Sequence, residues 1–265
     1  MIKIASHDGA NNVVKAINKY LMKNLSTEKD IQMLFASLHG RLFSMYDEHK
    51  PDYLLWPVSE YTQELQDFIT EYAVGIKIIL VVDVIIPQEE LNAFLNSRNN
   101  VAMIVDENLA TKYRNTILSY GRMYDDEVYH ASDNAERNDK IVALLSTDND
   151  KNHRMLDKII YPNNEHDHKI VVVNNPEFDS PVNVGIFNYY DLAFIFNTFN
   201  GVLDIDQAFQ LEAQACGIKY FDIDDGDILN SIDNNKYYTN IDDISERTYS
   251  HFVQNKLLPH LRKET

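Results

Sequence analysis

The sequence is poor in the residues that cross-link a chain or carry it through a membrane. It contains 1 cysteine and 8 glycines among 265 residues. A single cysteine excludes an internal disulfide and is typical of a reducing compartment. No apolar run approaches the roughly 20 residues that a membrane-spanning helix needs, so we expect no integral membrane segment. The N-terminal residues 1–7 have the pattern of a strand and not of a signal peptide, which predicts a cytoplasmic protein.

Basic residues are also scarce. Lys and Arg together number 24 against 41 Asp and Glu, which gives a net charge of −17. Such a field repels phosphate backbones and argues against general nucleic-acid binding, although a local basic cleft for a small phosphate ligand remains compatible with it. There is no Walker loop and no Ser-His-Asp elbow. The abundance of Asn, Asp, Lys, Ile and Tyr suggests an AT-rich bacterial or phage genome.

Strand-like and helix-like segments alternate along the chain. The apolar patterns predict strands at 1–5, 51–57, 76–84, 101–105, 140–145, 169–174 and 182–187. They predict helices at 13–21, 31–49, 60–72, 88–95, 111–120, 155–160 and 241–262. This alternation is typical of doubly wound α/β sheets. We take the polar segment 121–139 as an interdomain linker. The prediction is therefore an α/β protein with two Rossmann-like domains, 1–125 and 138–265, facing a cleft.

The stretch 201–223 is the most informative part of the sequence. It reads as a loop, a short helix and a strand. Asp206 is a suitable N-cap for the helix, and Gly217 is a suitable C′ residue because glycine accepts a left-handed conformation. Glu212 stands in the middle of this small apolar helix. A buried carboxylate needs a partner, and that partner is either protein or ligand.

Residues 211–217, Leu-Glu-Ala-Gln-Ala-Cys-Gly, resemble the L-E-A-x-A-C-G signature in the C-terminal domain of GT-B glycosyltransferases. That family carries a second acidic residue eight positions upstream, where this chain has Asp204. The resemblance implies that Glu212 holds the ribose hydroxyls of a nucleoside-diphosphate sugar and that Asp204 lies beside the donor sugar. A carboxylate can accept two hydrogen bonds from a vicinal diol, which agrees with this role. The two-acid pattern is commoner in retaining members and favours retention.

The first strand is followed by a polar loop that contains His7, Asp8 and Gly9 and then by a helix. A strand, a glycine-containing loop and a helix form the usual first unit of a Rossmann-like domain. In GT-B enzymes the corresponding loop faces the interdomain cleft, near the donor phosphate and the acceptor. The resemblance therefore makes His7 and Asp8 catalytic candidates and Gly9 a donor-binding candidate.

Two further segments gain candidates from the resemblance. The family carries a Gly-Arg-Leu…Lys-Gly sequence whose basic residues contact the donor diphosphate; here Lys151 fits the place of the lysine, with Arg154 one turn further on. Either cation could neutralise a leaving diphosphate at a helix N-terminus. Residues 189–197 resemble the family's strand that precedes the acidic motif, which implies that Asn197 and Thr198 line the donor site.

Metal-binding patterns are unconvincing. The acidic run from Asp222 has its glycine at position five and Asp233 at position twelve, so it does not match an EF-hand. Pairs of Asp separated by one residue are expected by chance in so acidic a chain. The sequence His166-Asp167-His168 lacks a third ligand nearby. We therefore expect no metal site and no cofactor besides the donor substrate.

The sequence thus favours a metal-independent glycosyltransferase that uses a nucleoside-diphosphate sugar. The acceptor stays open between a surface glycan and a phage-type hydroxymethylated DNA base, although the net charge argues against DNA. The alternative is a nucleotide-sugar epimerase-like enzyme or a non-catalytic GT-B-like binding protein.

Overall fold

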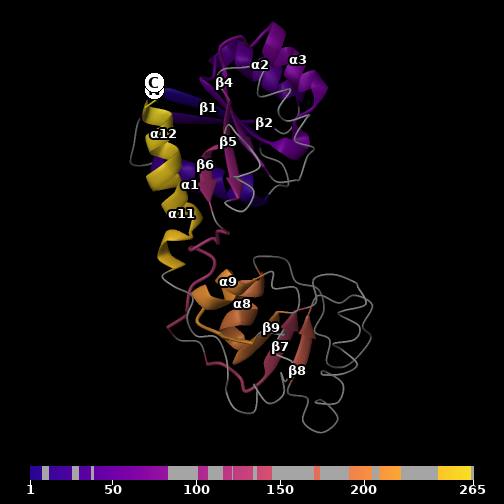
Figure 1. Ribbon diagram of the computed structural model, residues 1–265, viewed down its shortest axis with the longest axis vertical. Coiled ribbons are helices and arrows are strands. Elements are labelled where there is room, and N and C mark those ends of the chain that lie inside the picture. Colours follow the sequence, from indigo (N-terminus) through magenta and orange to yellow (C-terminus); the bar gives the residue numbers. More distant parts are fainter. Residues whose placement is uncertain are drawn as a thin grey trace. The chain divides into compact units, whose positions relative to one another are not determined.

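The chain forms two compact α/β units. The computed structural model describes residues 1–7, 12–25, 30–36, 39–82, 101–106, 116–120, 122–133, 136–144, 170–173, 191–204, 209–221 and 244–263. The first unit comprises Met1–Met123 and Ser245–Thr265, and the second comprises Tyr124–Ile244. Each unit contains a parallel sheet with packed helices (Figure 1). The predicted α/β class with two Rossmann-like sheets is confirmed, whereas the cleft stays a prediction.

The first sheet has six parallel strands in the order β2-β1-β3-β4-β5-β6. The strands are β1 (Ile2–His7), β2 (Ile31–Ala36), β3 (Tyr53–Pro57), β4 (Lys77–Val81), β5 (Val101–Asp106) and β6 (Thr116–Tyr120). The central strands β3 and β4 are buried on both faces, as the continuous apolar runs predict.

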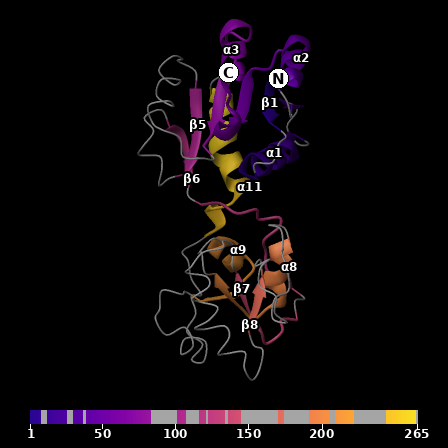
Figure 2. The ribbon, with the colours of Figure 1, turned by 90° about the vertical axis from the view of Figure 1, so that its right-hand side faces the viewer.

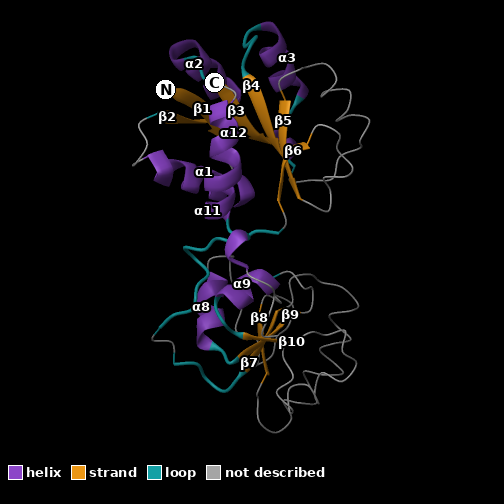
Figure 3. Ribbon diagram, turned by 60° about the vertical axis from the view of Figure 1, so that its left-hand side comes forward, coloured by secondary structure: helices purple, strands orange, loops and turns teal. Residues whose placement is uncertain are grey.

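Helices cover both faces of this sheet. Successive side chains of a strand point to opposite faces, so neighbouring residues of one strand pack against different helices. Tyr53 and Leu55 belong to the apolar core under α1 (Asn12–Leu25), while Leu54 and Trp56 belong to the core under α2 (His39–His49). The short η1 (Val58–Glu60) and α3 (Gln63–Glu71) lie on the α2 side. Figure 3 shows the resulting layers, with the sheet between α1 and the pair α2 and α3.

The C-terminal helices pack on the first unit, beside α1 (Figure 2). They are α11 (Tyr249–Phe252), the π-helical η4 (Val253–Leu257) and α12 (Leu258–Lys263), with Thr248 accepting the His251 N–H at the N-cap. Pro259 explains the π turn, because its ring lacks an N–H and crowds the carbonyl four residues earlier. The predicted second domain 138–265 included this segment, whereas its buried side chains complete the core of the first unit.

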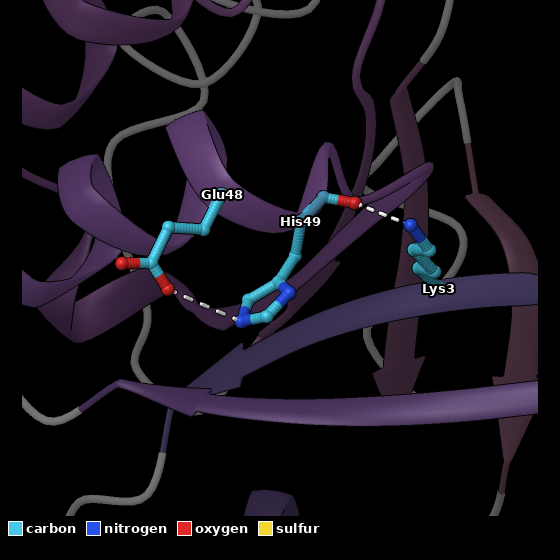
Figure 4. A network of polar contacts seen from close by, with 3 residues as sticks. All are labelled: Lys3, Glu48 and His49. Atoms are coloured by element: carbon cyan, nitrogen blue, oxygen red, sulfur yellow. Dashed lines mark hydrogen bonds and ion pairs between the residues drawn. The ribbon is translucent and has the colours of Figure 1, made fainter.

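The end of α2 is fixed to the first strand. Lys50 takes a left-handed φ of 47° directly after the helix, and Pro51 follows, so the helix cannot continue. Lys3 donates from Nζ to the His49 carbonyl at 2.7 Å, and His49 Nε2 lies 3.5 Å from a Glu48 carboxylate oxygen (Figure 4). The hydrogen bond from Lys3 joins the end of α2 to β1, whereas the Glu48–His49 contact lies within α2.

Two predicted helices are wrong where the chain forms the outer strands of the first sheet. Residues 31–36 form β2 instead of the start of the predicted helix 31–49, and residues 116–120 form β6 instead of the end of the predicted helix 111–120. Each strand pairs with one described neighbour, β1 and β5 respectively. Pairing with a distant strand overrides a local pattern that fits a helix equally well.

The second sheet has four described parallel strands in the order β10-β9-β7-β8. They are β7 (Ile141–Leu144), β8 (Ile170–Val173), β9 (Gly201–Asp204) and β10 (Lys219–Phe221). One face packs on α8 (Asp191–Thr198) and α9 (Gln210–Ala215) to form an apolar core. The one-turn η3 (Ile244–Glu246) follows where the chain returns to the first unit. The predicted elements at 88–95, 155–160 and 182–187 lie outside the described residues.

The secondary structure around the acidic motif differs from the prediction in three places. Residues 191–198 form a helix and not a strand, since Leu192, Ile195 and Phe196 are buried at helical spacing. Residues 201–204 form a strand and not a loop. The N-cap of α9 is Phe209, so the predicted cap Asp206 is wrong. Gly217 has a φ of +66°, which confirms the left-handed backbone conformation predicted for it after the helix.

The predicted linker 121–139 is part of the second unit from Tyr124 onward. Tyr124 and Tyr129 are buried in the apolar core with α8 and α9. The Asn138 N–H donates to the Thr198 carbonyl at 2.9 Å. A polar composition led to the linker interpretation, but the aromatic residues within it anchor the segment.

Gly201 permits a close approach inside the second sheet. A Cβ at this position would lie 2.5 Å from Cε2 of Phe221, a distance that van der Waals contact does not allow. We expect Gly201→Ala to lower the free energy of unfolding by about 1–3 kcal/mol through overpacking. Urea unfolding followed by circular dichroism measures this, and adding Phe221→Leu should recover part of the loss. Equal stability of Gly201→Ala and the unaltered chain would contradict the interpretation.

Candidate functional site

The second sheet has a topological switch point between β7 and β9. From β7 the chain first adds β8 on one side, and later adds β9 and β10 on the other. In open parallel sheets, ligands bind outside the carboxyl ends of the strands at such a point. Leu144 pairs with Asp204 in the register, and each is the last residue of its strand. Asp204 therefore lies at the carboxyl edge where a ligand is expected.

Asp204 is also bonded to the segment that begins α9. Its side chain is buried, with 1% of the residue exposed. Oδ2 accepts a hydrogen bond from the backbone N–H of Phe209 at 2.5 Å. Since Phe209 is the N-cap of α9, this carboxylate ties the end of β9 to the start of the helix.

Glu212 lies in the first turn of α9 and is 3% exposed. A carboxylate in the first turn is favoured by the positive end of the helix dipole. Glu212 lies three positions beyond Phe209, which Asp204 contacts, so both buried carboxylates belong to one short strand–loop–helix unit. Both carboxylates are buried, so each depends on hydrogen-bond partners to offset the cost of desolvation.

His7 lies at the corresponding switch point of the first sheet. It is the last residue of β1, which stands between β2 and β3. Its ring packs edge-on against Trp56, with centroids 4.5 Å apart and an interplanar angle of 82°. Asn18 Nδ2 donates to the His7 carbonyl at 3.0 Å, and Ser6 Oγ donates to Asn18 Oδ1 at 2.8 Å. This buried network fixes the backbone where the first loop begins.

Asn197 and Thr198 lie at the opposite edge of the second sheet from Asp204. They are the last two residues of α8, and the amino end of β9 follows shortly after them. Asn200, two residues after Thr198, donates its N–H to the carbonyl of Lys140, which precedes β7. The Asn197 amide is occupied by main chain, since Nδ2 donates to the carbonyls of Ala193 and His130. We therefore leave both residues out of the proposed donor site. Asp8, Gly9, Lys151 and Arg154 lie outside the described residues.

Sequence reasoning missed a cluster around the C-terminal end of α9. Arg137 donates from Nη1 to the Gly217 carbonyl and from Nη2 to the Cys216 carbonyl, both at 2.6 Å. Asn197 Oδ1 accepts the Ser132 N–H at 3.0 Å. The only signal in the sequence was an arginine within a polar segment, which does not identify a partner.

Burial raises the pKa of the Cys216 thiol from 9.0 to about 12, although Arg137 and hydrogen bonds with His130 and Asn197 act in the opposite direction. Between these pH values the folded thiol keeps its proton while the unfolded thiol loses it. The free energy of unfolding should therefore fall as pH rises above about 9, by up to about 1.4 kcal/mol per pH unit from this group. Urea unfolding at several pH values measures the slope. Cys216→Ala should show a shallower slope, and identical slopes would contradict the assignment.

Within the described ranges, no group of three His, Cys, Asp or Glu side chains is placed to hold a metal ion. No helix in that part of the chain is long and apolar enough to cross a membrane.

Comparison with known proteins supports the fold and not a particular activity. No family model matches the sequence, and no curated protein matches it. Several solved structures share the fold, and the following two align across nearly the whole chain. HepE from Anabaena, solved in complex with UDP and glucose, aligns with a TM-score of 0.59 at 11% identity, covering 99% of this chain and 100% of HepE. A candidate UDP-N-acetylglucosamine 2-epimerase from Listeria monocytogenes aligns with a TM-score of 0.52 at 11% identity, covering 100% of this chain and 96% of the other.

The two parallel sheets and these alignments define a GT-B-like α/β fold. At 11% identity the comparisons extend no further than the fold.

Proposed function

We propose that the chain is a glycosyltransferase that moves a sugar from a nucleoside-diphosphate sugar to an acceptor hydroxyl. The observation that carries this proposal is the pair of buried carboxylates, Asp204 and Glu212, at the switch point of the second sheet. The similarity to a structure that holds UDP and glucose supports a ligand of this class. In this proposal Glu212 accepts hydrogen bonds from the ribose hydroxyls, and Asp204 lies beside the donor sugar.

The proposed chemistry needs only groups of the chain. The acceptor oxygen forms a bond to the anomeric carbon, the bond from that carbon to the diphosphate breaks, and the diphosphate leaves with the electron pair. Lys151 and Arg154 are proposed to neutralise the leaving diphosphate, so no metal would be required. His7 and Asp8 are the proposed groups on the acceptor side, where one of them would take the hydroxyl proton. The two-acid pattern favours retention of anomeric configuration.

The acceptor class follows from charge. A net charge of −17 disfavours DNA as an acceptor, because its phosphates would be repelled. We therefore propose a glycan acceptor, with a hydroxymethylated DNA base as the alternative that an assay should include.

Titration of UDP into the protein by calorimetry tests the proposal first. We expect saturable binding, and release of UDP when UDP-glucose is supplied with a suitable acceptor, with or without EDTA. A thermal-shift screen with other nucleoside diphosphates identifies the base if UDP is not preferred. If no nucleoside diphosphate binds, the proposal is wrong, and loss of turnover in EDTA that manganese restores would exclude the metal-independent mechanism.

A nucleotide-sugar epimerase is the second candidate, favoured by the similarity to the Listeria structure. Epimerisation at C2 by proton abstraction breaks the C2–H bond, and the new hydrogen at C2 comes from solvent. Incubating UDP-N-acetylglucosamine with the protein in deuterium oxide therefore distinguishes the two activities. Deuterium at C2 of the sugar would favour the epimerase, whereas transfer without exchange favours the glycosyltransferase. Binding without either reaction would indicate a non-catalytic binding protein.

A further inference from the structure

The helix that carries Glu212 is too short to hold its own position. α9 has 6 residues, and isolated helices of this length are unstable in water because nucleation is costly. No side chain caps it through its own N-cap residue. Its position must therefore depend on contacts from other parts of the chain.

Two charged side chains hold the two ends of α9. At the N-terminal end, Asp204 Oδ2 accepts the Phe209 N–H at 2.5 Å. At the C-terminal end, Arg137 donates to the carbonyls of Cys216 and Gly217, at 2.6 Å each. A carboxylate at the start and a guanidinium at the end both complement the helix dipole.

Arg137 is connected to Glu212 through Cys216. The Cys216 N–H donates to the Glu212 carbonyl at 3.1 Å, so the residue that Arg137 holds is bonded to the residue that carries the carboxylate. Gly217 has a φ of +66°, which turns the chain sharply after the helix and directs consecutive carbonyls to one guanidinium. A lysine has no such planar pair of donors and could serve only one carbonyl at a time.

Arg137 is itself held from both sides. Before it, the Ser132 N–H donates to Asn197 Oδ1 at 3.0 Å, and Asn197 Nδ2 donates to the His130 carbonyl at 3.2 Å. After it, the Asn138 N–H donates to the Thr198 carbonyl at 2.9 Å. The segment around Arg137 is thus bonded to the end of α8, and Arg137 connects α8 with the end of α9.

We propose that Arg137 is a positioning residue for the donor site: it fixes the end of α9 and thereby sets where Glu212 meets the ribose. This inference rests on the proposed function, because it assumes that Glu212 binds a nucleoside diphosphate. Arg137 lies near the amino edge of the second sheet, so it acts through the helix and not by touching the ligand.

Calorimetric titration of UDP at a temperature where every variant is folded tests the inference. We expect Arg137→Ala to weaken UDP binding about tenfold, and Arg137→Lys to fall between Arg137→Ala and the unaltered chain. Arg262→Ala is the matched control, since Arg262 is a partly exposed arginine whose Nε lies 3.5 Å from Asp30 in the first unit. It should leave UDP affinity unchanged.

A double variant separates positioning from a general loss of stability. If Arg137 acts through Glu212, Arg137→Ala should have little further effect on UDP affinity in a chain that already carries Glu212→Gln. A lower melting temperature with unchanged UDP affinity in Arg137→Ala would overturn the inference and leave the proposed function intact. Equal fold-losses in both backgrounds would also overturn it, and absence of UDP binding by the unaltered chain would overturn both.

Discussion

Replacing Glu212 by glutamine should weaken UDP binding roughly ten- to a hundredfold. A carboxylate can accept hydrogen bonds from both ribose hydroxyls, whereas the amide has no charge and presents a donor in place of one acceptor oxygen. Loss of a charge-assisted hydrogen bond costs about 1.5–3 kcal/mol, which corresponds to that loss of affinity. The substitution preserves the shape of a side chain that is 3% exposed, so packing should change little.

Calorimetric titration with UDP, together with melting curves, measures this prediction. Glu71→Gln is the control for charge, because Glu71 is an exposed glutamate on α3 in the first unit. It should bind UDP as the unaltered chain does. If Glu212→Gln lowers the melting temperature and leaves UDP affinity unchanged, Glu212 serves an internal contact and not the ribose.

The parts of the fold that can be predicted from the sequence are those whose residue pattern fits only one type of secondary structure. The β-branched run of β4 and the apolar run of β3 predict buried parallel strands, and both are central in the sheet. β2 was harder, because four of its six residues are only half-buried and no alternation of buried and exposed side chains distinguishes it from a helix. Its strand conformation depends on pairing with β1, which no local window contains.

The wrong secondary structure for residues 191–198 changes where two of the predicted site residues lie. Residues 191–198 are rich in large apolar side chains, and the prediction made them a strand whose end would reach the donor. As helix α8 they run back to the amino edge of the sheet, and they carry Asn197 and Thr198 with them. Asp204 and Glu212 stay predictions as site residues; the structure places them in one strand–loop–helix unit, at the end of β9 and in the first turn of α9.

Arg137 could not be predicted for a different reason. Its two hydrogen bonds reach residues 79 and 80 positions away in the sequence, and a polar neighbourhood gives no indication of such partners. The same holds for the C-terminal helices, whose amphipathic pattern is readable while the surface they cover is not. A sequence pattern identifies which side of a helix is buried, but only the folded chain identifies the unit that buries it.

Removing residues 245–265 should prevent the first unit from folding. This segment supplies six large buried side chains to the core that α1 shares with the sheet: Tyr249, Phe252, Val253, Leu257, Leu258 and Leu261. Burying each such side chain contributes about 1.5–3 kcal/mol, so their sum is comparable with the whole stability of an ordinary domain, about 5–15 kcal/mol. Tyr53 in β3 would also lose the Leu261 carbonyl that accepts its hydroxyl at 3.2 Å.

Trp56 reports this loss directly. It is the single tryptophan of the chain and is fully buried in the first unit, so its fluorescence reports the folding of that unit. The truncated chain should show a red-shifted emission and no cooperative melting of this signal, while a control chain that ends at Lys263 should melt as the full chain does. Leu257→Ala should give a graded effect, a loss of about 2–5 kcal/mol, because it leaves a cavity in the same core. A truncated chain that keeps a blue-shifted emission and melts at the temperature of the full chain would show that the first unit folds without its C-terminal helices.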